Sequence, residues 1–328
     1  MKKTILLIGI LLITLLFINN SQLAYSWGFF AHKKINRMAV FTLPEGMLNF
    51  YKQHIEYITE HAVDPDKRRY VNKEEGARHY IDMDHYGRHA YDSVPHKWKD
   101  AVKKYSEDTL KAYGIVPWYI EKMMSRLTEA FRTENLDLIL HYSADIGHYI
   151  ADSHVPLHTT SNYNGQFTNQ IGIHGFWESR IPELKAKDYN LWVGKAVYIS
   201  QPIEKAWSTV KASNAEVDSV LKLEAKLNAT YPADKKYSYE NRGKKVIKVY
   251  SEEYTTAYNN MLNGMVERRM RASILTVGSM WYTAWANAGK PNLDKFGKKD
   301  ISDSLKLFNK TQQHLKNDTS KEVKGHND

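Results

Sequence analysis

Apolar residues recur at intervals of three and four along most of this chain, and this spacing constrains the fold more than any other feature. The clearest run covers residues 136–151, where the apolar positions share one side. Such a period is typical of an α-helix, and we expect the helix to end before Pro156. A second run over residues 250–285 predicts one long core helix that is closed by Gly289 and Pro291.

The rest of the chain adds helices and almost no strand. Helical patterns cover residues 34–41, 48–61, 98–113, 116–131 and 200–228, whereas alternation typical of a strand is convincing only at residues 245–250. No internal repeat and no Gly/Ser-rich linker divides the 328 residues. We therefore predict an all-α fold with a single helical domain.

The first 26 residues are predicted to be a signal peptide. Lys2 and Lys3 precede an apolar run that is too short to span a membrane comfortably, and Ala24-Tyr25-Ser26 supplies the small residues of a cleavage site. Cleavage after Ser26 predicts a secreted or periplasmic protein that begins at Trp27. The expected organisation is a signal peptide at 1–26, one domain at 27–295 with an elaboration at 182–249, and a polar tail at 296–328.

Composition excludes several kinds of site. The chain has no cysteine, so thiolate catalysis, thiolate zinc sites and iron–sulfur clusters are ruled out. Loss of the two signal-peptide lysines lowers the formal net charge from +9 to +7. The basic residues are scattered, which favours a solvated surface over a dedicated binding patch.

Histidines and carboxylates recur at the spacing of metal ligands. His148 and Asp152 are four residues apart, as are His174 and Glu178, so each pair lies on one face of a helix. His158 follows Pro156 and would approach the same cleft from another direction. A single pair of this kind is usually a surface hydrogen bond, but imidazoles and carboxylates together on apolar helices suit zinc.

These motifs resemble the superfamily of zinc-dependent phospholipases C and secreted single-strand nucleases of fungi and plants. The resemblance rests on an N-terminal Trp with a nearby His, an Asp followed by a His, the pattern His-x3-Asp-x5-His, and a final His-x3-Glu. Nine positions match in the family order: Trp27, His32, Asp64, His79, His148, Asp152, His158, His174 and Glu178.

The resemblance implies three zinc ions as cofactors and a helical domain of this type. The implied ligands of the first zinc ion are Asp64, His79, His148 and Asp152, and those of the second are Trp27, His32 and Asp152. The implied ligands of the third zinc ion are His158, His174 and Glu178. Asp152 would bridge two ions. Asp66 and His61 compete with Asp64 for the first ligand position, and Asp64 is preferred because its interval to His79 resembles that of the family. His154 is expected to be a helix-end residue and not a ligand.

The implied activity is that of a zinc-dependent phosphoric diester hydrolase, in which a zinc-bound hydroxide attacks a phosphoester. Asp64 and Asp152 are the implied catalytic carboxylates. Glu178, where the nucleases usually have Asp, and the missing Gly-Gly-Asn element favour a phospholipase C whose substrate is a phospholipid head group, with transient contact to a membrane surface. The five-residue step from Trp27 to His32 favours the alternative, a nuclease acting on single-stranded nucleic acid. A secreted zinc-binding protein without turnover is the third reading, and no obligate protein partner is evident.

Overall fold

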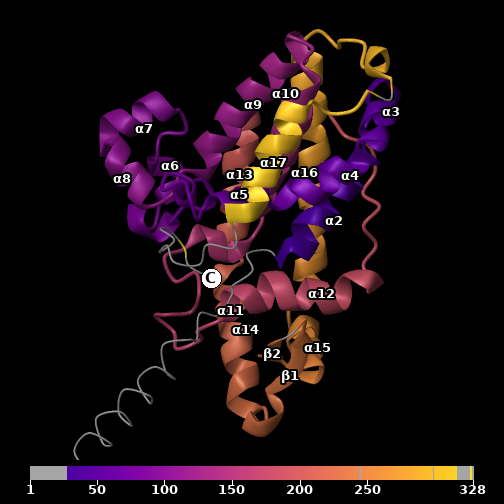
Figure 1. The fold of residues 1–328 in the computed structure, drawn as a ribbon. Helices are drawn as coiled ribbons and strands as arrows, with labels where there is room; N and C mark the ends of the chain where they lie inside the picture. Colours follow the sequence, from indigo (N-terminus) through magenta and orange to yellow (C-terminus); the bar gives the residue numbers. More distant parts are fainter. Residues whose placement is uncertain (1–27, 244, 298, 316–325, 327–328) are drawn as a thin grey trace, which may run out of the picture.

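The computed structural model describes residues 28–243, 245–297, 299–315 and 326, and these residues form a mostly helical domain (Figure 1). Its two strands, β1 Tyr237–Arg242 and β2 Lys245–Tyr250, pair antiparallel with Tyr237 opposite Tyr250. The all-α prediction is therefore confirmed, and β2 covers the residues at which strand alternation was predicted.

Five long helices form the body of the domain and bury its core. They are α2 Gly28–Val40, α9 Val116–Arg132, α10 Leu136–Ser153, α13 Pro202–Asn214 and α16 Met265–Asn287. Helix α10 packs against α9, α16 and α2, and α13 packs against α9. Three tryptophans, Trp177, Trp207 and Trp281, are among the largest side chains that are fully buried in this core.

Helix α10 is the central helix of the body and contacts α2, α9 and α16. The Asn135 side chain accepts a hydrogen bond from the backbone N–H of Leu138 and caps its first turn. The helix ends at Ser153, before Pro156, as the sequence predicts. At its centre Gly147 meets Asn36 of α2, where a Cβ atom would lie only 2.0 Å from Asn36 Oδ1. A glycine at this position allows α2 and α10 to approach closely.

The long helix predicted over residues 250–285 is wrong in one respect, because the chain turns in the middle. Helix α15 covers Glu252–Met261, and α16 starts only at Met265. Asn263 and Gly264 have φ angles of 48° and 74°, and helical backbone cannot continue through two left-handed residues. The apolar spacing continues across the break, which is why it does not reveal the turn.

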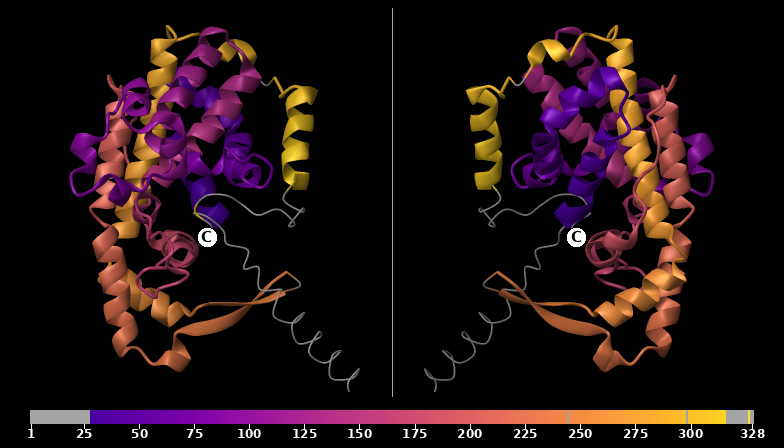
Figure 2. Two further views of the ribbon diagram at one scale, coloured as in Figure 1. Left: turned by 90° about the vertical axis from the view of Figure 1, so that its left-hand side faces the viewer. Right: turned by 90° about the vertical axis from the view of Figure 1, so that its right-hand side faces the viewer.

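Further helices cover the flanks of the body. They are α3 Glu45–Gln53, α4 Ile55–Glu60, α5 Asp64–Arg68, α6 Ala90–Ser93, α7 Trp98–Tyr105, α8 Glu107–Ala112, α11 Ile173–Gly175, α12 Ile181–Lys185, α14 Val217–Thr230 and α17 Asp303–Leu315. The hairpin extends from one end of the molecule, beyond α14 and α15 (Figure 2). Helix α17 lies in the segment predicted to be a polar tail, and it packs against α5.

None of the helices within the described ranges is both long and apolar enough to cross a membrane.

Candidate metal centre

Three groups of buried histidines and carboxylates lie together at the end of α10. We name them the first group (His32, Asp66 and His148), the second group (His79, His148 and Asp152) and the third group (His158, His174 and Glu178). In each group, one potential ligand atom from every residue lies within 4.8 Å of the others. Because all members are buried, each group forms a small polar cluster inside an apolar domain.

The side chains of the groups come from segments that are far apart in the chain. His32 lies on the first turns of α2, and Asp66 lies on the short helix α5. His79 directly follows a 3₁₀ turn at Gly76–Arg78. His148 and Asp152 lie one turn apart on α10, and His148 belongs to both of the first two groups.

Asp152 lies between the first two groups. Its Oδ1 atom is 3.3 Å from His32 Nε2, while its Oδ2 atom is 2.9 Å from His79 Nδ1 and 3.2 Å from His148 Nε2. The imidazoles of His32 and His148 stack at a centroid distance of 3.9 Å. Each oxygen of Asp152 therefore faces a different set of imidazole nitrogens, which is the arrangement a carboxylate needs in order to join two cations.

The third group is built on an irregular helical segment. His174 lies on α11 and Glu178 lies on the π-helical turn Phe176–Arg180 that follows it. Glu178 Oε2 is 3.0 Å from His174 Nε2 and 3.3 Å from His158 Nε2. The π-turn is consistent with a functional role, because such bulges occur frequently at functional sites.

Backbone carbonyls orient two of the histidines. His148 Nδ1 lies 2.8 Å from the carbonyl oxygen of Ala62, and His158 Nδ1 lies 2.7 Å from the carbonyl oxygen of His79. When Nδ1 carries the proton and donates to a carbonyl, Nε2 presents its lone pair to the pocket. This is the way in which metal-binding histidines are usually held.

Asp66, and not the Asp64 preferred from the sequence, is a member of the three groups. Both Asp64 oxygens have other partners, His61 Nδ1 and Lys67 Nζ, each at 2.6 Å. Asp66 Oδ1 instead lies 3.5 Å from His148 Nε2. Two residues separate about 200° around a helix, so only one of these carboxylates can point to the centre.

Two carboxylates of the groups, Asp66 and Asp152, are held in their charged form. Burial alone would raise the pKa of Asp66, but His148, His79 and His32 together lower it below its ordinary value. Asp152 behaves in the same way: burial opposes the charge, while His148 and His158 lower its pKa further. Several imidazoles converging on two buried anions would require the histidines to share protons. A bound cation removes that requirement.

The residues fit a zinc ion. Glu178 Oε1 is buried and has no hydrogen-bond partner among the described residues, which is costly for a carboxylate unless a further positive group is present. Imidazole nitrogens and carboxylate oxygens are established zinc ligands, and no sulfur is needed. Each group supplies three such side chains, all buried.

Trp27 lies outside the described residues. The residue that follows it, Gly28, begins α2, and its N–H donates a 2.9 Å hydrogen bond to Ser179 Oγ. Ser179 is adjacent to Glu178 in sequence, and His32 lies one turn along α2. The start of the described chain is thus fixed beside the third group.

Comparison with known families identifies the chain. A family described as zinc dependent phospholipase C matches residues 31–241, which is more than half of the sequence. The chain belongs to this family. No curated protein matches the sequence. The family match extends beyond the ligand motifs and includes α13, α14 and β1 as far as Asn241. Family membership establishes zinc dependence and a hydrolase of the phospholipase C type.

The sequence analysis did not identify Glu75, which lies beside the metal centre. Glu75 is fully buried, accepts a hydrogen bond from Arg78 at 2.5 Å, and has Oε1 3.7 Å from His79 Nε2. It lies four residues before His79, the same spacing that revealed the other His/carboxylate pairs. Glu75 therefore contacts the outer edge of the His79 ring.

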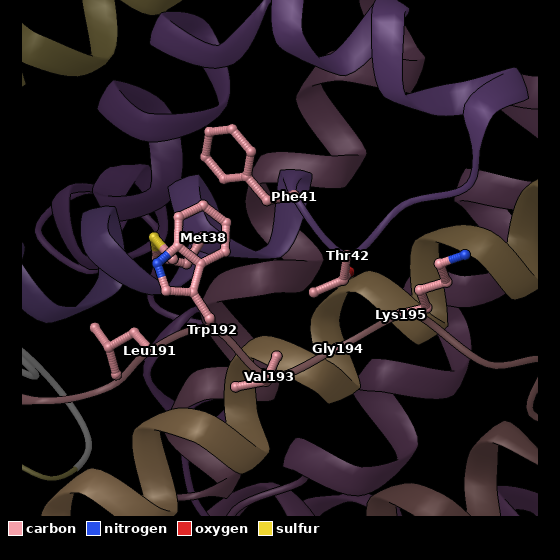
Figure 3. Close-up of a pocket in the computed structure, with 8 residues that line it drawn as sticks. All are labelled: Met38, Phe41, Thr42, Leu191, Trp192, Val193, Gly194 and Lys195. Carbon is pink, nitrogen blue, oxygen red and sulfur yellow. The ribbon is translucent and has the colours of Figure 1, made fainter.

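A separate pocket of about 300 Å³ lies away from these groups. It forms where residues 191–195 pass the C-terminal end of α2, and its lining includes Met38, Phe41 and Trp192 (Figure 3). No member of the three groups contributes to it, so it is not part of the metal centre.

Proposed function

We propose that this protein is a secreted phosphodiesterase that hydrolyses phospholipids as a phospholipase C. The observation that carries the proposal is the convergence of three buried ligand groups in a member of the zinc dependent phospholipase C family. Bound zinc supplies activation of water near neutral pH and neutralisation of phosphate charge. Three groups give room for three ions, and Glu178 in the last ligand position favours the lipid substrate.

The chain's own residues have separable roles in this proposal. Asp152 joins the first two groups, and Asp66 takes the ligand position that the sequence analysis assigned to Asp64. Asp66 is then also the carboxylate that accepts a proton from the attacking water. Trp27, once freed by cleavage after Ser26, supplies its amine and carbonyl to the first group.

A nuclease is the second candidate, and one contact favours it. The imidazole of His326 stacks on Tyr80 and Tyr163 beside the third group. Aromatic side chains that sandwich a nitrogen heterocycle also suit a base of single-stranded nucleic acid. The two candidates share the metal centre and differ in the group held beside it.

A substrate panel tests the proposal. The mature protein with a free Trp27 amine is loaded with zinc and given phosphatidylcholine micelles, single-stranded DNA and single-stranded RNA. We expect release of the phosphorylated head group and diacylglycerol, loss of this activity on chelation, and its recovery when zinc is added. Cleavage of nucleic acid without lipid turnover would assign the nuclease, and failure on all substrates with zinc bound would favour a non-catalytic protein.

Two variants link that activity to the centre. Asp152→Asn removes the carboxylate that contacts two groups, whereas Glu178→Gln removes a ligand from one group. We expect both to lose most activity and Asp152→Asn to lose more. Circular dichroism is recorded alongside, since metal loss can also unfold a site. Equal and mild effects would contradict the bridging role.

A further inference from the structure

The side chain of His326, close to the C-terminal end of the sequence, is held between two aromatic rings. Its imidazole stacks on Tyr80 at a centroid distance of 3.7 Å with an interplanar angle of 19°, and on Tyr163 at 3.9 Å with an angle of 9°. Two six-membered rings cannot share one face of an imidazole at these distances. The tyrosines therefore lie on opposite faces, and we call this pair the aromatic clamp.

Polar contacts hold the same residue in place. His326 Nε2 lies 2.8 Å from Asp82 Oδ1, and the guanidinium of Arg69 donates to the carbonyl oxygen of His326. Asp82 is itself 7% exposed, so this bond lies in a largely dry site. Stacking, a side-chain hydrogen bond and a backbone hydrogen bond thus all act on one residue.

The aromatic clamp borders the metal centre. Tyr80 directly follows His79, and the Tyr163 ring lies 5.9 Å from the ring of His174. The His326 ring lies 6.5 Å from the ring of His158. Any substrate whose phosphate reaches the third group must place its adjoining group close to this space.

We propose that His326 is an autoinhibitory residue, which occupies the aromatic clamp and competes with substrate. The proposal rests on the proposed function, because it concerns access to that same centre. The occupant belongs to the chain itself: the eleven residues from Leu315 at the end of α17 to His326 can reach at most about 36 Å. Helix α17 packs on α5, which carries Asp66, so the segment starts on the flank of the centre.

The contacts predict reversible and incomplete inhibition. One residue with two stacked rings and two hydrogen bonds forms a small interface, and we expect the free segment to bind with a dissociation constant of about 100 μM. Attachment to the chain raises its effective concentration to about 1 mM. These values leave about one molecule in eleven with an empty clamp, so the apparent affinity for substrate falls by about tenfold.

The first test uses the full chain and point variants. His326→Ala should raise kcat/KM for a soluble short-chain substrate by about tenfold, mainly through KM, because it removes the competitor and no other residue of the centre. His314→Ala removes a histidine from the same C-terminal segment and is the matched control, with wild-type kcat/KM. Equal kcat/KM for His326→Ala and wild type would overturn the proposal.

The second test does not depend on turnover. A synthetic peptide of residues 320–328 is titrated into the zinc-loaded full-length His326→Ala protein by isothermal calorimetry. We expect binding near 100 μM that is lost when the peptide carries His326→Ala and weakened by Tyr163→Leu in the protein. A peptide that binds as expected while no substrate is turned over leaves the inhibitory contact standing and rejects the proposed function. A peptide that fails to bind overturns the contact, whatever the activity.

Discussion

Asp64 and Asp66 differ in their neighbours, although one proline separates them in the sequence. Asp66→Asn should lower activity by more than the roughly 10- to 100-fold that is typical of residues around the ligands of a metal, because it removes a carboxylate from the first group. Asp64→Asn should retain most activity but cost about 1–3 kcal/mol of stability, since it leaves His61 and Lys67 without their partner. Activity, zinc content and urea unfolding of both variants measure this difference. A greater loss of activity in Asp64→Asn would reverse the assignment.

His154 gives the folded protein a dependence on pH. It follows α10, and its Nδ1 lies 2.8 Å from the carbonyl oxygen of Ile150. Burial, followed by the charge of Arg269, lowers the pKa of His154 well below its ordinary value. The folded protein keeps this imidazole neutral while the unfolded chain takes up a proton below about pH 6.5. Stability is therefore fully present above that pH and falls as the solution becomes more acidic.

His154→Asn should remove this dependence, because the amide can replace the Nδ1 donor and does not titrate. Between pH 6.5 and pH 5.5 the wild type should lose about 1 kcal/mol of unfolding free energy more than the variant. Urea unfolding at both pH values, under one zinc condition, measures the difference. Parallel losses in the two proteins would show that His154 does not contribute.

At the scale of elements, the contact between α2 and α10 positions the ligands that these helices carry. In Gly147→Ala the new Cβ would collide with Asn36, whose Nδ2 already donates to the carbonyl oxygens of Ala144 and Ile58. We expect a loss of about 1–3 kcal/mol and weaker zinc retention, because His148 is the next residue. Thermal unfolding and zinc analysis measure both effects.

Gly175→Ala is the matched control for this prediction. Gly175 also adjoins a histidine of the groups, His174, but it has a helical φ of −61°, and a Cβ atom added there would meet no described atom within 4 Å. The substitution should be neutral or slightly stabilising. If both alanine variants lost the same stability, close approach of α2 and α10 would not be the cause.

The helices could be predicted from the sequence because a buried helical face requires apolar residues at intervals of three and four. The order of the ligand motifs was sufficient to indicate the family. Periodicity does not report local backbone, so Asn263 and Gly264 divide a helix that the pattern shows as continuous. It also cannot decide which of Asp64 and Asp66 faces inward, because that depends on where α5 begins. His326 could not be predicted at all, since its contacts are with residues more than 160 positions away.

At the scale of the whole molecule, both ends of the chain are proposed to contribute to the centre. If Trp27 supplies its amine after cleavage, a Met or tag placed before it converts that amine to an amide, which is a poor metal donor. Mature protein should begin at Trp27 and carry close to three zinc ions, whereas a tagged form made without cleavage should retain less zinc and have low activity. N-terminal sequencing and elemental analysis check this. Equal zinc and activity in both forms would exclude Trp27 as a ligand.

The hydrogen bond from the His158 ring to the carbonyl oxygen of His79 has a consequence for how the protein takes up metal. The ring of His79 belongs to the second group, and its peptide orients a histidine of the third, so ions at either position immobilise the same stretch of backbone. Filling should then be all-or-none. At half the saturating amount of zinc, native mass spectrometry should detect mainly empty and full molecules, and a dominant population of partly filled ones would show that the positions load independently.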